Sequence, residues 1–237
     1  MNNLQSIISR TVNNTMSEFE KLAGYTSSAA NYNTNGFKAS RFENILQETG
    51  RVTSVQRTNY AVGDAVETHR QLDVAVTGPG FIPITQKDGT MAFTRDGAFG
   101  VNKDGIMVTK SGDIVGDGIK IPANYHRIKI ESDGTVTVQM EKYSEFNKVG
   151  NLPLVGFYNP EGLKLLDGNK VIATEKSGEP ILIKNHRSIK QGALERSNVS
   201  LFDTVQEVLK LNAGVISGTR LLKIVDDMYN QAISLRQ

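Results

Sequence analysis

Histidine is the residue type best suited to move protons near neutral pH, so the three histidines are the first candidates for chemistry. His69, His126 and His186 are far apart in the sequence, and none falls in an HExxH metal-binding pattern. The chain has no cysteine, which excludes thiol nucleophiles, disulfides and zinc–cysteine sites together. A GxSxG sequence, the usual anchor of a serine hydrolase, is also missing. We interpret the histidines as surface or structural residues and predict that the protein is not an enzyme.

Two glycine-rich stretches resemble ligand loops but lack the residues that those loops need. SGDIVGDGIK, residues 111–120, does not have the order GxxxxGK[ST] of a phosphate loop, and turn glycines explain it better. VNKDG, residues 101–105, fits the middle of a calcium loop, but the positions that need carboxylates are then Gly100 and Ser111. Most other aspartates precede glycine, as turn formers do. We therefore predict no catalytic residues, no metal site and no cofactor.

Composition limits the partners. The 237 residues are 38% hydrophobic, enough for a real core, and the net charge is only +2 with scattered basic residues. Such a chain has no electrostatic footprint for nucleic acid. The first residues contain no unbroken apolar stretch that could serve as a signal peptide, and nothing approaches the ~20 apolar residues of a membrane span. We expect no nucleic acid, no membrane insertion, no small-molecule substrate, and a different route if the protein leaves the cytoplasm.

Apolar residues recur at steps of three and four at both ends of the chain. This pattern predicts amphipathic helices from Leu4 to about Ala30 and from about Ser200 to Leu235. Ser200, with Asp203 three positions later, is typical of a capped helix start. Two such helices flanking the rest of the chain most simply pair with each other.

The C-terminal helix has more apolar residues than one partner can cover, which predicts contacts with further copies of the chain. The residues concerned are Leu201, Phe202, Leu211, Leu221, Leu222, Ile224 and Val225. Gly214 and Gly218, four positions apart, would each weaken an isolated helix by about 1 kcal/mol relative to alanine. They either permit close helix approach or mark a flexible point.

The middle of the chain has a different pattern. Short alternating or apolar runs are separated by Asp-Gly pairs, which predicts an all-β domain of hairpins. The fold class is then mixed α and β: long terminal helices pair as a coiled-coil-like core around an inserted all-β domain. We predict a discontinuous helical core domain of residues 1–30 plus 197–237, an all-β domain of residues 71–190, and an extended connecting segment of residues 31–70 with one or two strands.

The stretch NYNTNGFKAS, residues 31–40, lies where the first helix must end. Its asparagines and glycine tolerate left-handed backbone, and Gly36 is the expected position of positive φ. Phe37 is then free to anchor against a helix or a neighbouring subunit. The alternative is a local hairpin turn through Asn35 and Gly36.

Four motifs, in the same order along the chain, resemble those of the bacterial flagellar basal-body rod and hook proteins. They are an Asn-x-x-Thr-x-Gly-Phe-Lys run, a Gly-x-Gly-Phe followed by Thr-Arg between Asp-Gly turns, a Gly-x-Leu-Glu-x-Ser-Asn-Val element, and the closing KIVDDMYNQAISLRQ. The residues that match the first three are Asn31, Thr34, Gly36, Phe37, Lys38, Gly80, Phe81, Thr94, Arg95, Gly192, Leu194, Glu195, Ser197, Asn198 and Val199. The family's usual Asn-Asn-Leu-Ala-Asn is here Ser27 to Asn31, and LNAGVISG, residues 211–218, replaces its usual last-helix stretch.

The resemblance implies a structural subunit that polymerises helically into the flagellar drive shaft and transmits motor torque to the hook. It also implies export through the flagellar type III apparatus without a cleaved signal, a place in the rod in the periplasm, and partners among its own copies and neighbouring rod and hook proteins. The motif residues are then assembly residues. The chain length favours a proximal rod subunit, and the alternatives are the distal rod protein or a hook-type subunit. A secreted β-rich binding or hydrolytic domain is the alternative from another class.

Overall fold

The computed structural model describes residues 2–46, 52–184 and 187–234, and the chain divides into two compact units. The helical unit consists of Met1–Asn31, Ala39–Asn59 and Val199–Gln237, and the β-rich unit consists of Tyr32–Lys38 and Tyr60–Asn198. Helices at both ends and a β-rich part between them confirm the mixed α and β class. The finer domain boundaries predicted from the sequence stay a prediction.

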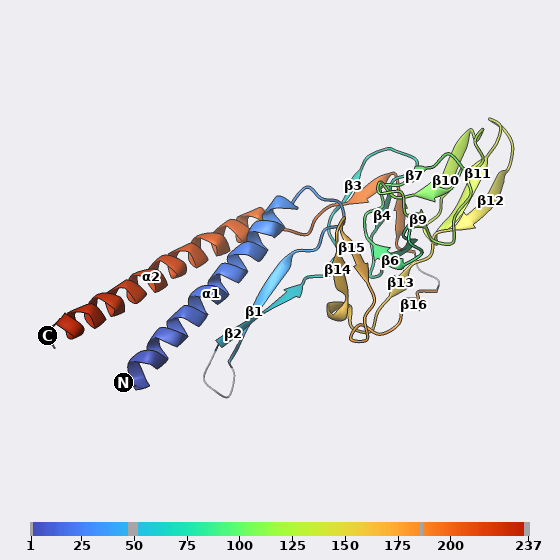
Figure 1. Ribbon diagram of the computed structural model, residues 1–237. Helices are drawn as coiled ribbons and strands as arrows, with labels where there is room; N and C mark the ends of the chain where they lie inside the picture. Colours follow the sequence, from blue (N-terminus) through green and yellow to red (C-terminus); the bar gives the residue numbers. More distant parts are fainter. Residues whose placement is uncertain (1, 47–51, 185–186, 235–237) are drawn as a thin grey trace. The chain divides into compact units, whose positions relative to one another are not determined.

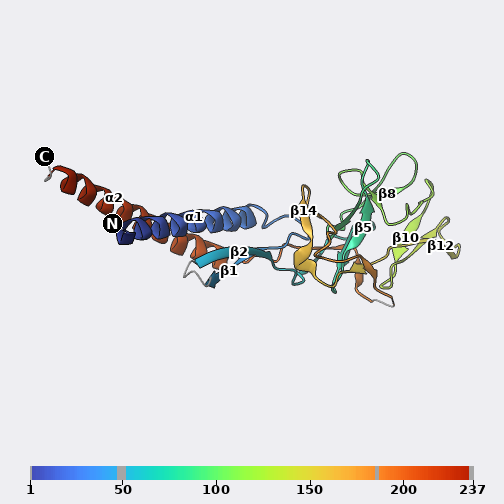
Figure 2. The same cartoon turned by 60° about the horizontal axis from the view of Figure 1, so that its bottom comes forward.

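Two long helices form most of the helical unit and lie side by side (Figures 1 and 2). Helix α1 spans Asn2–Ala30 and helix α2 spans Leu201–Ser234. The Ser200 hydroxyl accepts a hydrogen bond from the Asp203 N–H at 3.3 Å, as the predicted cap requires. Within the described residues, neither helix is both long and apolar enough to cross a membrane.

A hairpin packs along α1 in the same unit. Strands β1 (Ser40–Leu46) and β2 (Val52–Thr58) are antiparallel, with Ser40 opposite Thr58. The Phe42 ring contacts the Tyr25 ring at 5.2 Å and covers Gly24, where a β-carbon would overlap it. The Phe42–Tyr25 contact therefore holds the hairpin on α1, and it requires glycine at position 24, because any larger residue there would overlap the Phe42 ring.

The two glycines of α2 lie at close approaches to α1. A β-carbon on Gly214 would lie 2.7 Å from the Glu18 carboxylate, and one on Gly218 would lie 2.5 Å from the Thr15 hydroxyl. Thr15 is buried and donates a hydrogen bond to the Thr11 carbonyl at 2.9 Å. Close helix approach, one of the two readings open from the sequence, is thus what the structure shows.

We predict opposite outcomes for alanine at these two glycines. Gly214→Ala should raise the free energy of unfolding by about 0.5–1 kcal/mol, because the helix gains propensity and the end of the flexible, half-buried Glu18 side chain can move aside. Gly218→Ala should gain nothing or lose stability, because the hydroxyl of buried Thr15 is held by its bond to Thr11. Urea unfolding monitored by helical circular dichroism compares them, and equal shifts for both variants would contradict the assignment.

The β-rich unit contains one large antiparallel sheet and several small ones. The large sheet has the order β14-β15-β6-β5-β9-β8-β7, and a three-stranded sheet has the order β10-β11-β12. The pairs β13-β16, β17-β4 and β18-β3 complete the unit. The strands before the three-stranded sheet are β3 (Ala65–Glu67), β4 (Val74–Val76), β5 (Ile82–Thr85), β6 (Met91–Thr94), β7 (Gly100–Val101), β8 (Met107–Val108) and β9 (Ile114–Val115). The later elements are β10 (Arg127–Ile130), β11 (Thr135–Gln139), β12 (Phe146–Asn151), β13 (Val155–Gly156), the 3₁₀ turn η1 (Pro160–Gly162), β14 (Lys164–Leu166), β15 (Lys170–Ile172), β16 (Ile181–Leu182), β17 (Ile189–Gln191) and β18 (Ala193–Glu195).

The hydrophobic core belongs almost entirely to the β-rich unit. Its main cluster includes Val74, Ile82, Phe99 and Met107 at exposures of 0–1%. A second cluster gathers around Phe81 and includes Phe93, Val155, Leu163 and Val171. Among the described residues, Val199 is the one buried hydrophobic side chain of the helical unit.

The predicted Asp-Gly turns are confirmed with one exception. Asp-Gly suits turn positions with positive φ, so positive φ is expected at all six Asp-Gly glycines of the sequence. Five of them have it: Gly89, Gly105, Gly118, Gly134 and Gly168. The expectation is wrong for Gly97, which is a glycine for a different reason. Its backbone packs so closely on the Val74 carbonyl that a β-carbon would overlap it, and its own carbonyl accepts the Val74 N–H at 3.0 Å.

Candidate functional site

Residues from three of the sequence motifs meet inside the β-rich unit. Lys38 comes from the segment after the first helix, Arg95 follows β6, and Glu195 ends β18. Lys38 lies 157 positions before Glu195 in the sequence, and Arg95 lies 100 positions before it. We call these three residues the buried charge triad.

The Glu195 carboxylate bridges the two cations. One oxygen accepts the Lys38 ammonium at 2.6 Å and the Gly63 N–H at 2.8 Å, and the other accepts the Arg95 Nε–H at 2.7 Å. The side chains of Lys38, Arg95 and Glu195 are 5%, 3% and 1% exposed. Water therefore cannot screen or replace these interactions, and each is stronger than at the surface.

The Arg95 guanidinium also organises nearby backbone. It donates to the carbonyls of Gly80 at 2.5 Å, and of Val76 and Gly78 at 3.0 Å each. Its carbon lies 5.9 Å from the centre of the Phe81 ring. Only a planar group with several fixed N–H donors can satisfy a carboxylate and three carbonyls together.

Neighbouring contacts hold the stretch at residues 31–40, where the first helix ends. Gly36 has φ +65°, as predicted, and a β-carbon there would lie 2.6 Å from the Arg95 backbone. Its N–H donates to the Glu195 carbonyl at 2.8 Å, and the Asn198 N–H donates to the Phe37 carbonyl at 3.3 Å. A local turn through Asn35 and Gly36 is also present, because the Thr34 carbonyl accepts the Phe37 N–H at 3.3 Å. The elements on either side of it are α1 and β1, so this turn does not join two strands of a hairpin.

The structure places the remaining motif residues around this junction or beyond it. Phe81 centres the aromatic cluster with Tyr60, Phe93 and Phe157. Gly192 has φ +71°, and its carbonyl accepts the Thr68 and His69 N–H groups.

The other motif residues contribute to turns and pairing. The Thr34 carbonyl accepts the Phe37 N–H, and Thr94 is buried. Leu194 of β18 lies opposite Val66 of β3. Ser197 is half-buried in the β-rich unit, whereas Asn31, which directly follows α1, and buried Val199 belong to the helical unit.

Sequence reasoning missed the backbone groups that complete the site. Lys38 also donates to the Ala61 carbonyl at 2.6 Å, and the Asn198 amide donates to the same carbonyl at 2.9 Å. Backbone partners leave no side-chain signature. The one available signal is Gly63, where a β-carbon would overlap the Arg196 carbonyl.

The arrangement holds charge but offers no chemistry to a substrate. Every member of the buried charge triad is occupied by partners from the chain itself. Elsewhere in the described residues, no group of three or more His, Asp or Glu side chains could hold a metal ion. His126 is exposed, His69 lines a pocket considered below, and His186 lies outside the described residues.

Burial lowers the pKa of the Lys38 ammonium from its ordinary 10.5, and nearby Arg95 lowers it further, against the opposing effect of Glu195. The unfolded chain therefore binds this proton more strongly than the folded chain. Below the lowered pKa, both states are protonated and the cost of burying the charge is fully present. As the pH rises toward 10.5, that cost disappears and stability increases.

We expect this effect in the difference between the native chain and the variant Lys38→Met. The free energy of unfolding of the native chain, minus that of the variant, should rise with pH in the alkaline range and level off near pH 10.5. Urea unfolding at a series of pH values measures this difference, in which the titration of other groups cancels. Lys190→Met, at an exposed ion pair with Glu67, is the control, and a native-minus-variant difference that falls with pH would contradict the burial argument.

Comparison with known proteins identifies the class that this architecture represents. Residues 75–138 match the family described as "Flagellar hook protein FlgE/F/G D1 domain". The chain is 30% identical to the flagellar basal-body rod protein FlgG of Buchnera aphidicola subsp. Schizaphis graminum, covering 87% of this chain and 90% of the relative. It is 30% identical to FlgG of Agrobacterium fabrum, over 84% and 87% of the two chains. It is 28% identical to the rod protein FlgF of Mesorhizobium japonicum, over 88% and 83%.

A solved structure, the Helicobacter pylori hook protein FlgE2, aligns with 67% of this chain and 42% of its own at 13% identity, with a TM-score of 0.24. The sequence relatives decide the matter: this chain belongs to the flagellar basal-body rod protein family, among the axial proteins of rod and hook. It is a structural subunit of the flagellar rod, as the sequence predicts. The relatives named above are structural proteins and not enzymes.

Proposed function

We propose that this subunit polymerises helically, through its terminal helices, into the shaft that transmits motor torque to the hook. In this proposal the helices pair as a coiled-coil-like core lining the inner tube, and the β-rich unit forms the outer wall. The subunit is exported through the flagellar type III apparatus without a cleaved signal and functions in the periplasm. Its partners are other copies of itself and the neighbouring rod and hook proteins.

One observation carries the proposal: the helical unit leaves its apolar side chains exposed. Leu209, Ile216, Ile224 and Met228 of α2 are 45–63% exposed, and Phe19 of α1 is 52% exposed. Isolated helices bury such stripes only against partners, and the single chain does not supply enough of them. Contacts that repeat between copies without closing into a ring build a helical shaft.

An open groove in the helical unit supports the same proposal. It has a volume of about 640 Å³ and is lined by Ile8 of α1 and by Leu222, Val225 and Tyr229 of α2, among others. Lys223 and Asp226 lie at its sides. An apolar groove with charged sides suits an amphipathic helix from a second copy.

A substitution of one exposed leucine in each unit tests assembly separately from folding. Leu209→Ser, in α2, should leave the unfolding of the monomer unchanged but abolish swimming when the variant replaces the native protein in a deletion strain. Leu165→Ser is the matched control, because Leu165 lies in the β-rich unit and is 54% exposed against 63% for Leu209. Normal swimming and normal rods with Leu209→Ser would reject assembly through α2.

The position along the rod stays a prediction. The proximal type is our preferred assignment, and the distal rod protein or a hook-type subunit is the alternative. Electron cryotomography of basal bodies carrying a density tag on the exposed Lys142–Ser144 turn would show the axial height of the subunit. A tag near the membrane-proximal end supports the proximal type, and a tag next to the hook supports an alternative.

A further inference from the structure

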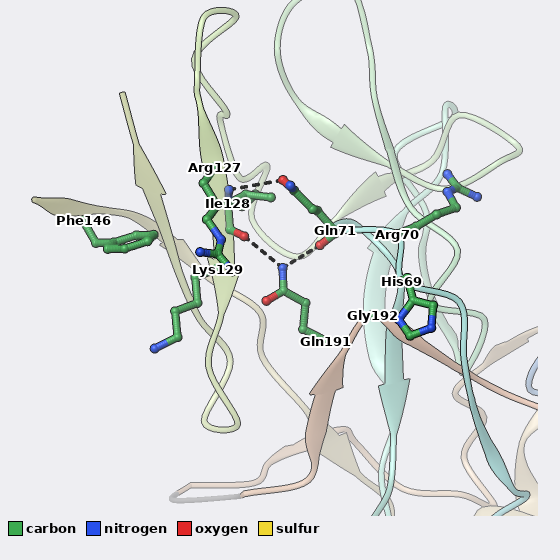
Figure 3. A pocket seen from close by; sticks show the side chains of 9 residues that line it. All are labelled: His69, Arg70, Gln71, Arg127, Ile128, Lys129, Phe146, Gln191 and Gly192. Carbon is green, nitrogen blue, oxygen red and sulfur yellow. Dashed lines mark hydrogen bonds between the residues drawn. The ribbon is translucent and has the colours of Figure 1, made fainter. Parts of the chain in front are cut away.

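A basic pocket in the β-rich unit has no role in the proposed assembly. It has a volume of about 580 Å³ and lies between the turn at residues 69–71, the end of β17, and strands β10 and β12 (Figure 3). Its lining includes Arg70, Arg127 and Lys129 and contains no carboxylate. The volume falls within the range of about 300–1,000 Å³ usual for ligand sites.

Two glutamines fix the wall of this pocket. The Gln191 amide donates to the carbonyls of Gln71 at 2.7 Å and Ile128 at 3.1 Å, and its oxygen accepts the Ile130 N–H at 3.1 Å. The Gln71 side-chain oxygen accepts the Ile128 N–H at 3.4 Å. Figure 3 shows the bonds that join the two glutamines to Ile128 of β10 and to each other. The edge of β10 is thereby satisfied, and the pocket is formed in advance of any ligand.

The cations of β10 are exposed on one face of the three-stranded sheet, and a lysine and a phenylalanine of β12 lie on the same face. Arg127 and Lys129 are exposed, while Ile128 and Ile130 between and after them are buried. Across the sheet, Lys129 pairs with Thr137, which pairs with Lys148 of β12. Arg127 likewise leads through Gln139 to Phe146. One face of this small sheet therefore presents three cations and an aromatic ring.

Few carboxylates compete for these cations. Lys129 pairs with Glu131 at 2.6 Å, but both side chains are about half exposed, and such pairs are easily exchanged. The Arg70 guanidinium lies 3.5 Å from the carboxylate of buried Asp73, while the Arg70 side chain is 62% exposed. Within the part of the chain that the structure describes, Arg127 forms no ion pair.

We propose that this pocket binds an extended acidic peptide segment of a partner protein. Arg127 and Lys129 stand two positions apart on one strand, so their stems are about 6.6 Å apart at ~3.3 Å per residue. Carboxylates at alternate positions of an extended peptide have the same spacing. Alternating carboxylates can therefore each pair with one cation, and Phe146, which also lines the pocket, offers an apolar surface to the same segment.

Fluorescence anisotropy of a labelled octapeptide with glutamate and serine at alternate positions tests this site on the full chain. At low ionic strength we expect saturable binding, and the double variant Arg127→Gln/Lys129→Gln should raise Kd about tenfold. Both positions are exposed, so the double variant should fold normally by circular dichroism. Lys103→Gln, an exposed lysine in the β7–β8 turn, changes charge away from the pocket and should leave Kd unchanged.

Four outcomes would overturn the proposal. The first is no saturable binding by the native chain, and the second is a loss of binding in Lys103→Gln as large as that in the double variant. The third is that a peptide with four consecutive glutamates binds as tightly as the alternating peptide. The fourth is that a single-stranded oligonucleotide or inorganic phosphate displaces the labelled peptide as well as the unlabelled alternating peptide does. The last two would show a general attraction for anions without the spacing that β10 supplies. None of these outcomes bears on the proposed assembly through α2.

Discussion

Replacing Glu195 with glutamine should lower the free energy of unfolding of the β-rich unit by about 3–5 kcal/mol. The amide keeps the shape of the side chain but removes the charge that Lys38 and Arg95 share. Both cations are at most 5% exposed and would remain buried without a counter-ion. Breaking a buried ionic cluster on one side is costly for this reason, although the intact cluster itself need not add much net stability.

The matched control is Glu67→Gln. Glu67 lies opposite Ala193 in the same β3–β18 pair and bonds Lys190 at 2.9 Å, but its side chain is 59% exposed. That variant should change the free energy of unfolding by less than about 1 kcal/mol. Urea-dependent hydrogen exchange of the β5 and β6 amides reports on the β-rich unit in both cases. A loss below 1 kcal/mol for Glu195→Gln would mean that water reaches the buried charge triad.

Replacing Arg95 with lysine should cost about 2–4 kcal/mol even though the charge is kept. An ammonium has three donors on one atom and cannot reach Glu195 together with the carbonyls of Val76, Gly78 and Gly80. At least one of these buried acceptors is then left without a partner. The cost should appear as a lower urea midpoint for the β5 and β6 amides.

Arg57→Lys provides the comparison for this substitution. Arg57 bonds Glu43 through Nε at 2.7 Å, the same atom and distance with which Arg95 bonds Glu195. Its side chain is 33% exposed, and the strand that carries it is the β2 edge of the hairpin. We expect a change within about 1 kcal/mol there. Similar losses at both arginines would show that the geometry of Arg95 has no special importance.

Much of the fold follows from patterns within short stretches of sequence. Apolar residues that recur every three or four positions predict α1 and α2, and the Asp-Gly pairs predict most of the hairpin turns. Both signals depend on local geometry and need no knowledge of distant residues. The prediction for Gly97 failed because the role of this glycine depends on a residue distant in the sequence: the Val74 backbone lies against it.

Two strand regions lack this local signal: one or two strands were predicted within residues 31–70 but their positions were not, and β12 was not predicted. The β1–β2 hairpin has polar sequences, SRFENIL and VTSVQRT, with no clean alternation. It is held on α1 by the Phe42–Tyr25 contact and by polar bonds such as that from the Lys21 ammonium to the Asn44 side chain at 2.7 Å. Strand β12, FNKVGN, is largely exposed and is defined by its pairing with β11.

The candidate site was found in the sequence, but its physical role was not. Resemblance to the rod and hook proteins selects Lys38, Arg95 and Glu195 as assembly residues. The structure shows them buried together in one subunit, so they first serve folding. Periodicity could not reveal this, because the contacts span 100 or more positions. Whether the remaining motif residues act in assembly stays a prediction.

The pairing of residues 36–37 with residues 195–198 has an architectural consequence. The β-rich unit consists of a short segment, Tyr32–Lys38, and a long one, Tyr60–Asn198, and the ends of both are bonded to one another. The Gly36 N–H donates to the Glu195 carbonyl, and the Asn198 side chain donates to the Ala61 carbonyl, so the places where the chain enters and leaves this unit adjoin. Inserted modules are tolerated best where their ends lie close together. Residues could therefore be added at a distal turn such as Lys142–Ser144 without altering where the chain enters and leaves.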